Sequence, residues 1–230
     1  MKTFFLVLSL VYLCSRPAST ECQPDQLETC TCSMYKDAGF CTGTYANYMA
    51  TNCDTTCNCQ VIIPDEETVY TESVDSASCL GSHNNKRALH STTPSLTWSS
   101  SIASAAETYA LEMATNGVFQ HSGSSYGENL YWKQSTVAGT CENAVDSWYS
   151  EEQYYDYSTG TQKSGYESEA IGHFTQVVWK STSEVGVGIA IKKTTTKNGC
   201  QIYYETYIVG QYNPSGNWGG QYTTNVMEKQ

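Results

Sequence analysis

The cysteines of this chain are distributed so unevenly that they constrain its fold more than any other feature. The chain has 230 residues and 11 cysteines. Seven of them crowd between positions 22 and 59, and only three lie beyond that segment. A segment this short buries too little apolar area to stay folded alone, so disulfides must hold it together. The pattern predicts a small cysteine-rich module followed by a larger domain.

The first 20 residues have the pattern of a secretory signal peptide. Lys2 provides a basic start, an apolar run extends from Phe4 to Cys14, and small residues follow Pro17. The run is too short to span a bilayer, and no later segment offers 18 consecutive apolar residues. We therefore expect cleavage near Glu21, export to the extracellular space and no transmembrane segment.

Removal of the signal peptide takes away Cys14 and leaves 10 cysteines. An even number of cysteines in an exported protein indicates disulfides. The cysteines expected in disulfides are Cys22, Cys30, Cys32, Cys41, Cys53, Cys57, Cys59, Cys79, Cys141 and Cys200.

The charge of the chain narrows the range of partners. The whole chain carries a net charge of −11, and loss of Lys2 and Arg16 leaves 10 basic against 23 acidic residues, or −13. Such a chain lacks the positive charge that draws proteins to nucleic acid or to anionic lipid. We expect no nucleic-acid partner, whereas divalent cations and basic partners fit better.

The larger part begins with helical patterns. Apolar residues from Ile102 to Met113 recur every three or four positions, and Gly117 follows as a stop, which predicts an amphipathic helix. A second, shorter helix is expected at 144–151.

Two strand patterns follow these helices. Apolar residues alternate at 185–191 and again at 202–208, with a Lys–Asn–Gly turn at 197–199 between them. This arrangement predicts an antiparallel pair of strands. Helices that precede strands in this way indicate the α+β class, with helices packed on a sheet.

The same patterns define the expected domain organisation. A linker is expected between the cysteine-rich part and the cysteine-poor part, where the sequence contains Pro64 and a cluster of acidic residues. The expected segments are a signal peptide at 1–20, a cysteine-rich module at 21–59, a linker at 60–77, a larger domain at 78–220 and a C-terminal tail at 221–230.

The spacing of cysteines in the small module resembles that of the ShK-type toxin domain, a short helical scaffold with three disulfides. The resemblance implies the pairs Cys22–Cys59, Cys32–Cys53 and Cys41–Cys57. The last gap between cysteines holds one residue where the family usually has two, and Cys30 is surplus to the pattern. One hypothesis pairs Cys30 with Cys79, which would leave Cys141 to pair with Cys200. Spacing alone does not decide the connectivity.

Five segments of the larger part carry a second resemblance. They are HNNKRALH at 83–90, FQHSGSSYGENLYW at 119–132, WYSEE at 148–152, GHFTQVVWKSTSEVGVG at 172–188 and YIVGQYNPSGNW at 207–218. In this order they resemble the CAP superfamily of cysteine-rich secretory proteins, venom antigens and plant pathogenesis-related proteins. The resemblance covers about residues 78–218 and implies a three-layer α-β-α sandwich.

The resemblance also implies that His121, Glu128, Glu151 and His173 meet in a surface cleft. Two imidazoles and two carboxylates suit Zn²⁺ or another divalent cation. The same residues could perform general acid–base chemistry, because a nearby carboxylate moves the pKa of a histidine. They could also form a purely structural hydrogen-bonded cluster. The spacing contains no compact zinc motif such as HExxH.

Other residues of the larger domain are less informative. His83 and His90 are interpreted as surface or packing residues. Ser122 follows His121 and resembles a nucleophile suggested for some relatives, but a local hydrogen bond is the favoured interpretation, since the sequence shows neither base nor oxyanion hole. The segment 133–140, which forms a lipid-covering loop in relatives, is short and polar here, so lipid binding is not favoured.

Three classes of function remain. The first is an extracellular binding or effector protein with a metal-binding cleft, acting on an unidentified extracellular protein or lipid ligand. The second is a venom-like modulator of an ion channel, which the small module suggests. The only basic residue of the small module, Lys36, is outnumbered by acidic residues, and this negative charge opposes docking to a cation pore. The third is a metal-assisted hydrolase, less favoured because the G-x-S-x-G, HExxH and P-loop motifs are absent.

Overall fold

In the computed structural model of this chain, the described residues are 66–195 and 202–230, with short pieces at 13–14, 36, 41, 43–45, 47–48, 52 and 59–60. The chain divides into two compact units. The first comprises Met1–Glu67 and Thr194–Ile202, and the second comprises Thr68–Lys193 and Tyr203–Gln230.

The first unit contains little described structure. Strand β1 (Leu13–Cys14) pairs antiparallel with β2 (Cys59–Gln60), and one turn of 3-10 helix, η1, covers Gly43–Tyr45. Cys41 is disulfide-bonded. The predicted pairs Cys22–Cys59, Cys32–Cys53 and Cys41–Cys57 each involve residues outside the described ones and stay predictions.

The second unit is built on a twisted sheet. Its strands are β3 (Glu66–Glu72), β4 (Thr97–Trp98), β5 (Gly127–Ser135), β8 (Glu184–Thr195) and β9 (Ile202–Asn213). They run in the order β3-β8-β9-β5, with β4 parallel to the start of β8. The Ser183 N–H donates to the Asn213 carbonyl, so β8 begins where β9 ends. The antiparallel strand pair that was predicted from alternation is therefore confirmed.

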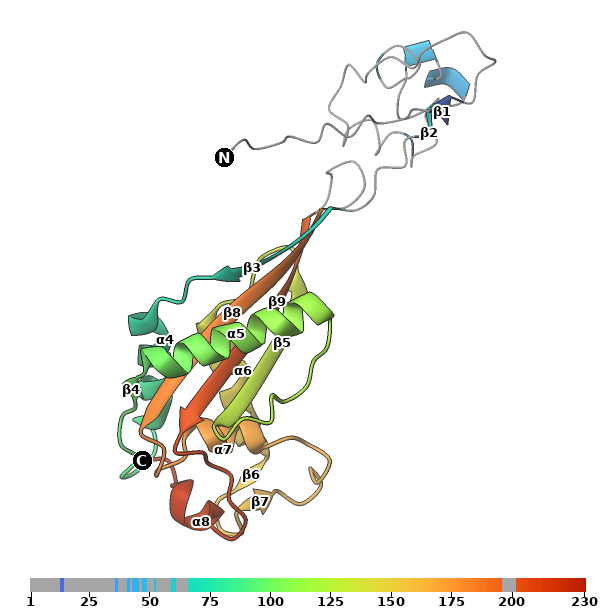
Figure 1. The fold of residues 1–230 in the computed structure, drawn as a ribbon. Coiled ribbons are helices and arrows are strands. Elements are labelled where there is room, and N and C mark those ends of the chain that lie inside the picture. Colours follow the sequence, from blue (N-terminus) through green and yellow to red (C-terminus); the bar gives the residue numbers. More distant parts are fainter. Residues whose placement is uncertain are drawn as a thin grey trace, which may run out of the picture. The chain divides into compact units, whose positions relative to one another are not determined.

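Helices cover both faces of this sheet (Figure 1). They are α4 (Ser76–Arg87), α5 (Ser100–Asn116), α6 (Cys141–Ser150) with the 3-10 turn η2 (Glu151–Tyr154), α7 (Gly172–Val177) and α8 (Tyr222–Asn225). A two-stranded ribbon of β6 (Tyr155–Asp156) and β7 (Thr161–Gln162) lies between η2 and α7. The α+β class is confirmed, and both predicted helices are present.

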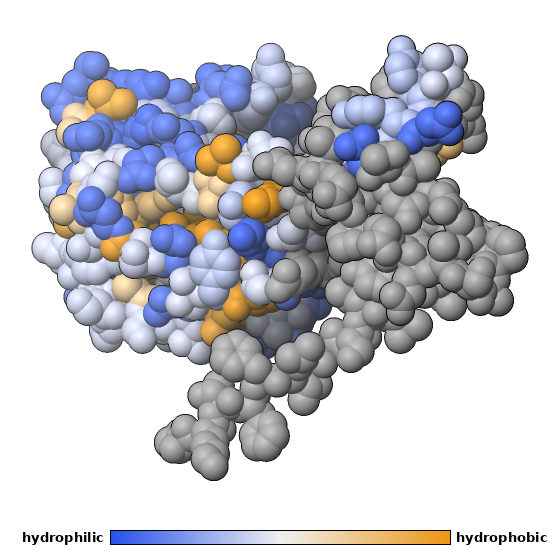
Figure 2. Space-filling model, turned by 90° about the horizontal axis from the view of Figure 1, so that it is seen from above, coloured by the Kyte–Doolittle hydropathy of each residue, from blue (hydrophilic) through white to orange (hydrophobic). Residues whose placement is uncertain are grey.

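The two faces of the sheet carry separate cores because successive strand residues point to opposite sides. On one face, Ile189 and Ile208 join a large cluster with Trp148 of α6 and Phe174 of α7. On the other face, their neighbours Ala190 and Val209 join a smaller cluster with residues of α5. Figure 2 shows hydrophobic residues in a band across the middle of one end of this unit, between more hydrophilic margins.

Helix α5 lies unusually close to the sheet, and glycines permit this. A Cβ atom built on Gly186 would collide with the backbone of Ala103, and one on Gly188 would collide with the backbone of Glu107. The predicted stop also holds, since Gly117 ends α5 in the left-handed conformation with φ 66°, where glycine carries no Cβ penalty.

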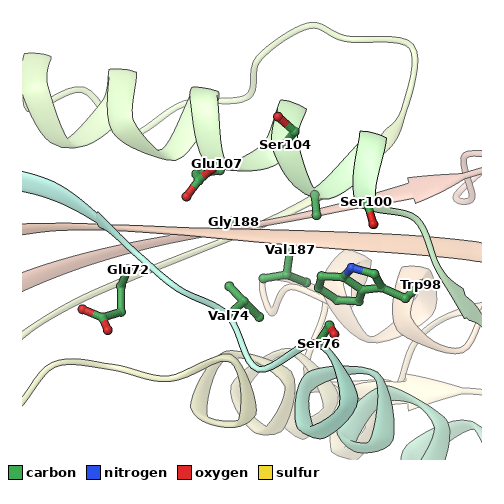
Figure 3. Close-up of a pocket in the computed structure, with 10 residues that line it drawn as sticks. Glu72, Val74, Ser76, Trp98, Ser100, Ser104, Glu107, Val187 and Gly188 are labelled. Carbon is green, nitrogen blue, oxygen red and sulfur yellow. The ribbon is translucent and has the colours of Figure 1, made fainter.

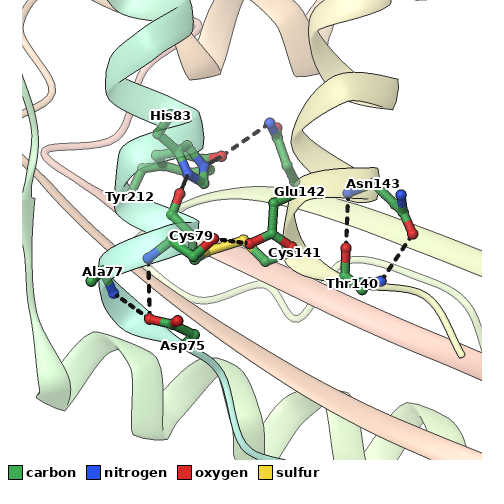
Figure 4. Close-up of a disulfide and its surroundings, with 11 residues drawn as sticks. Asp75, Ala77, Cys79, His83, Thr140, Cys141, Glu142, Asn143 and Tyr212 are labelled. Atoms are coloured by element: carbon green, nitrogen blue, oxygen red, sulfur yellow. Dashed lines mark hydrogen bonds between the residues drawn. A yellow bond between two sulfur atoms is a disulfide. The ribbon is translucent and has the colours of Figure 1, made fainter.

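The disulfide of the larger unit differs from the one hypothesised. Cys79 in α4 bonds to Cys141 in α6, across a sequence separation of 62 residues (Figure 4). The hypothesised pairs Cys30–Cys79 and Cys141–Cys200 are therefore wrong. The physical reason is that α4 and α6 pack side by side and bring the two cysteines together in the buried core, at 0% and 3% exposure. Cys30 and Cys200 lie outside the described residues.

Two segments are more ordered than expected. Within the predicted linker 60–77, residues 66–72 form the edge strand β3, and α4 begins at Ser76. Within the predicted tail, α8 forms, Val226 is buried, and the Gln230 N–H donates to the Leu89 carbonyl. Among the described residues, no helix has both the length and the apolar character needed to cross a membrane.

Candidate functional site

The first predicted pair of site residues, His121 and Glu128, is brought together where the chain enters β5. Nδ1 of His121 lies 2.9 Å from Oε1 of Glu128. The same oxygen accepts the Ser122 N–H at 2.9 Å, and Oε2 accepts the Ser122 hydroxyl at 2.6 Å. The imidazole is 65% exposed, whereas the carboxylate side chain is only 6% exposed. The pair therefore presents an accessible imidazole on a fixed, buried carboxylate.

Glu128 is held from the neighbouring strand as well. Register places Gln211 of β9 opposite Glu128 of β5, and Nε2 of Gln211 donates to Oε2 of Glu128 at 3.1 Å. Burial acts to raise the pKa of Glu128, but the hydrogen bonds from Ser122, Gln211 and His121 outweigh it and lower that pKa below its usual value. Glu128 is therefore ionised at neutral pH.

The second predicted pair, Glu151 and His173, joins η2 to the start of α7. Nδ1 of His173 lies 2.6 Å from Oε1 of Glu151. Oε2 of Glu151 accepts the backbone N–H groups of His173 and Phe174 at 2.9 and 3.1 Å. These donors belong to the first turn of α7, which has no intrahelical acceptors for them. The His173 side chain remains 34% exposed.

In both pairs, the Nε2 atom of the histidine is left without a hydrogen bond to the described residues. A carboxylate beside Nδ1 favours the tautomer in which Nδ1 carries the proton and Nε2 keeps its lone pair. In the described part of the chain, neither Nε2 has a hydrogen-bond partner. A carboxylate that fixes the tautomer of a histidine in this way is typical of the outer shell of metal sites. Glu128 and Glu151 thus orient the histidines.

The first pair opens into a cleft of about 700 Å³. Apart from the pair, its walls come from the loop 122–127, from Gln176 of α7 and from the segment 215–218. Trp218 at its rim is 58% exposed. Neither Glu151 nor His173 lines this cleft. The four predicted residues therefore form two pairs; no three of them offer ligand atoms within 4.8 Å of one another.

Helix α7 connects the two pairs. Its Gln176 side chain lines the cleft and accepts the Gly216 N–H at 2.9 Å. Asn217 donates to the Gly172 carbonyl at 2.9 Å, next to His173. Asn129, which follows Glu128, donates to the carbonyl of His173 at 3.0 Å. The second histidine is thus held by the same framework that shapes the cleft.

Several of these supporting residues were missed in the sequence. Gln211, Gln176 and Asn217 lie in segments that resemble family motifs, but nothing in their spacing shows which of them faces the site. Their roles depend on strand register and on the packing of α7. Ser122, in contrast, makes the local hydrogen bonds that the sequence interpretation favoured.

Among the described residues, a different set of side chains brings potential metal-ligand atoms close together. Ligand atoms of Cys79, His83 and Cys141 lie within 4.8 Å of one another. The two cysteines form the disulfide, so they offer no thiolate, and His83 is engaged by the Cys79 carbonyl at 2.9 Å and the Tyr212 hydroxyl at 3.0 Å (Figure 4). His83 and His90 are buried packing residues, at 0% and 1% exposure.

The fold and site define an α+β domain with two carboxylate-oriented histidines, one of them on an open cleft. The model of the cysteine-rich secretory protein family, CAP, matches residues 80–212, more than half of the 230 residues. This chain therefore belongs to the CAP, or cysteine-rich secretory protein, family. The match does not include residues 21–59, whose resemblance to ShK-type domains stays a prediction.

Relatives in fungi and plants share this region. The chain is 43% identical to Protein PRY2 of Saccharomyces cerevisiae over 152 residues, which are 66% of this chain and 41% of PRY2. It is 36% identical to pathogenesis-related protein 1A of Nicotiana tabacum over 143 residues, 62% of this chain and 76% of that protein. The chain thus spans less than half the length of PRY2.

One solved structure matches part of this chain. It is described as the crystal structure of NaASP2 with Zn²⁺, and it matches with a TM-score of 0.48 and 22% identity. The match covers 70% of this chain and 88% of that chain.

Proposed function

We propose that this chain is a secreted binding protein whose CAP domain holds a divalent cation, Zn²⁺ in the first instance, through the imidazoles of His121 and His173. Glu128 and Glu151 act as the carboxylates that fix the imidazoles, not as the ligands themselves. The bound cation would supply a Lewis acid beside the cleft for an anionic or carbonyl-bearing group of an extracellular partner.

The single observation that carries the proposal is the shared geometry of the two pairs. In each, a carboxylate holds Nδ1 of the histidine, Nε2 has no hydrogen-bond partner among the described residues, and the imidazole side chain is partly exposed. Two neutral imidazoles suit Zn²⁺, which needs deprotonated nitrogen ligands. Secretion is supported by the signal-peptide pattern at 1–20 and by the buried disulfide Cys79–Cys141, which is typical of oxidising compartments.

The other two classes of function receive no specific support from the described residues. The hydroxyl of Ser122 donates to Glu128 and not to an imidazole, so the Ser–His pair of a serine nucleophile is not formed. A metal-assisted hydrolase would instead depend on the same proposed cation, and sensitivity of any hydrolysis to a chelator would test it. Channel modulation would depend on residues 21–59, most of which lie outside the described ones.

Calorimetric titration of the mature protein with Zn²⁺ at neutral pH tests the proposal. We expect one saturable site in the wild type, retained in Gln120→Ala, whose exposed side chain lies next to His121. Loss of binding is expected in His121→Ala, in His173→Ala and in the double variant. Binding that persists in the double variant would overturn the site, provided that circular dichroism shows all variants folded.

A further inference from the structure

Helix α5 has a pocket near each of its ends. Near its start, Ser100 and Trp98 border a pocket of about 320 Å³ between α5 and β8 (Figure 3). Beyond its end lies another pocket, of about 410 Å³, and the two share no lining residue. The described residues that line the pocket at the helix end are Gly117, Phe119, Trp132, Glu205 and Tyr207. None of them lines the histidine cleft, so this pocket is a separate candidate site.

Two large aromatic side chains of this pocket are left uncovered by the core. Leu130 of β5 and Tyr207 of β9 are buried in the smaller core cluster, against α5. Trp132 follows Leu130 by two residues and so lies on the same face of the sheet, but it is 46% exposed. Phe119, in the loop that follows Gly117, is 52% exposed. Both aromatic side chains are therefore accessible to a ligand.

A carboxylate is held in position beside these aromatic residues. Glu205 precedes Tyr207 by two residues on β9, so both side chains point to the same face of the sheet. The hydroxyl of the buried Tyr207 donates to Oε2 of Glu205 at 3.1 Å. Within the described residues, Glu205 forms no ion pair and no basic residue lines the pocket. The described lining therefore carries a negative charge and no positive one.

The end of α5 adds to this negative potential. The carbonyl groups of the last turn of a helix have no intrahelical partners and carry a partial negative charge. Gly117, which caps the C-terminal end of this 17-residue helix, is part of the pocket lining. The other pocket lies near Ser100, at the positive end of the same helix. Of the two pockets, the one beside Gly117 is therefore the one in which the helix dipole favours a cation.

We propose that this pocket binds a quaternary ammonium group, such as that of choline. The faces of aromatic rings carry partial negative charge and attract cations, and aromatic residues recognise quaternary ammonium ligands in this way. The trimethylammonium group would lie against Phe119 and Trp132, with Glu205 as its counter-charge. A primary ammonium is more strongly hydrated and would lose more on leaving water. An anion would be repelled by Glu205 and by the helix end.

The first test separates the charge of the ligand from its shape in the wild-type mature protein. The indole N–H resonance of Trp132, assigned with Trp132→Leu in isotope-labelled protein, reports binding. Choline is titrated beside dimethylbutanol, in which a carbon atom replaces the charged nitrogen, and beside ethanolamine, which lacks the methyl groups. We expect a saturable shift with choline and binding at least about fivefold weaker for the other two. No saturable shift with choline, or equal affinity for either of the others, would overturn the proposal.

The second test assigns the binding to residues of the lining. Glu205→Gln removes the counter-charge, and Phe119→Leu keeps the apolar bulk but removes the ring, so each should weaken choline binding about threefold. Glu169→Gln removes an equal charge from an exposed position between β7 and α7 and should leave the affinity unchanged. Thermal unfolding checks that the variants are folded. Equal affinity in Glu205→Gln and Glu169→Gln would overturn the site.

A quaternary ammonium group could come from a free ion or from the head group of a phosphatidylcholine lipid. Sedimentation with phosphatidylcholine vesicles distinguishes the two sources. Protein that binds choline and stays in solution takes the group from a free ion. Protein that sediments with the vesicles and is released by choline takes it from the lipid, and either result supports the proposed site.

Discussion

At the scale of single residues, one serine has two effects at the candidate site. Ser122 donates both its backbone N–H and its hydroxyl to Glu128, one to each carboxylate oxygen. Those bonds, together with Gln211 and His121, overcome the effect of burial and hold the pKa of Glu128 low. An ionised Glu128 then fixes the tautomer of His121. A residue that resembles a nucleophile in the sequence therefore acts as a hydrogen-bond donor to the acidic partner of the histidine.

Replacement of this hydroxyl should change the titration of Glu128. In Ser122→Ala the pKa of Glu128 should rise, because one donor to the charged form is lost while burial is unchanged. The lowered pKa in the wild type gives stability that is present above the unfolded value and is lost as the pH falls through the folded value. We therefore expect a free energy of unfolding lower by about 1 kcal/mol at neutral pH and a smaller further loss in acid.

Carboxyl-resolved NMR titration and urea unfolding measure these two quantities. Ser125→Ala, at an exposed position of the same loop, should change neither of them. An unaltered titration of Glu128 in Ser122→Ala would contradict the role given to the hydroxyl.

At the scale of elements, the approach of α5 to the sheet depends on residues that have no side chain. Gly186 and Gly188 alternate with Val185, Val187 and Ile189 on β8, so every residue facing α5 at this point is a glycine. The alternation in the sequence identified the strand, whereas the reason for the glycines appears only once the helix is packed on it.

The packing of α5 on β8 can be tested by comparing two glycine-to-alanine substitutions, one at this contact and one away from it. Gly188→Ala should destabilise the protein by about 1–3 kcal/mol, because the added methyl forces α5 away from β8. Gly81→Ala lies inside α4 with no atom within 4 Å of the new methyl, and should stabilise it by up to about 1 kcal/mol. Thermal and urea unfolding compare the two variants with the wild type. Similar stabilities in both would refute the close approach of α5.

At the scale of the whole molecule, buried polar side chains join the helices to the sheet and the loops. Arg87 at the end of α4 is fully buried and donates to carbonyls at the end of α7 and just beyond it, at Val177, Trp179 and Thr182. His90 bonds to the Met227 carbonyl and the Tyr149 hydroxyl, and so holds the C-terminal segment. These contacts join segments that are far apart in the sequence.

The two buried histidines should therefore make the protein acid-sensitive. Burial lowers the pKa of His83 to about 4 from the usual 6.5, and it lowers the pKa of His90 as well. Because the unfolded chain takes up protons first, stability should be full above about pH 6.5 and should fall between pH 6.5 and 4. The shift at His83 alone corresponds to about 3 kcal/mol.

Urea unfolding at several pH values across this window tests the expectation. His83→Gln should be less stable at neutral pH and should show a shallower decline in acid. A free energy of unfolding that stays constant from pH 7 to 4.5 in the wild type would refute the claim that these histidines are neutral and buried.

Much of the larger domain was determined by its sequence alone. Periodicity identified α5, the strands β8 and β9 and the α+β class, because local backbone geometry fixes which residues share a face. The motifs predicted the four candidate site residues and indicated the family, and the cysteine count indicated disulfides. Only the tertiary structure decided the partner of Cys79, the separation of the site into two His–Glu pairs, and the roles of Gln211 and the glycines facing α5. These features depend on strand register and on which helices pack side by side, and such contacts between distant residues leave no periodic pattern in the chain.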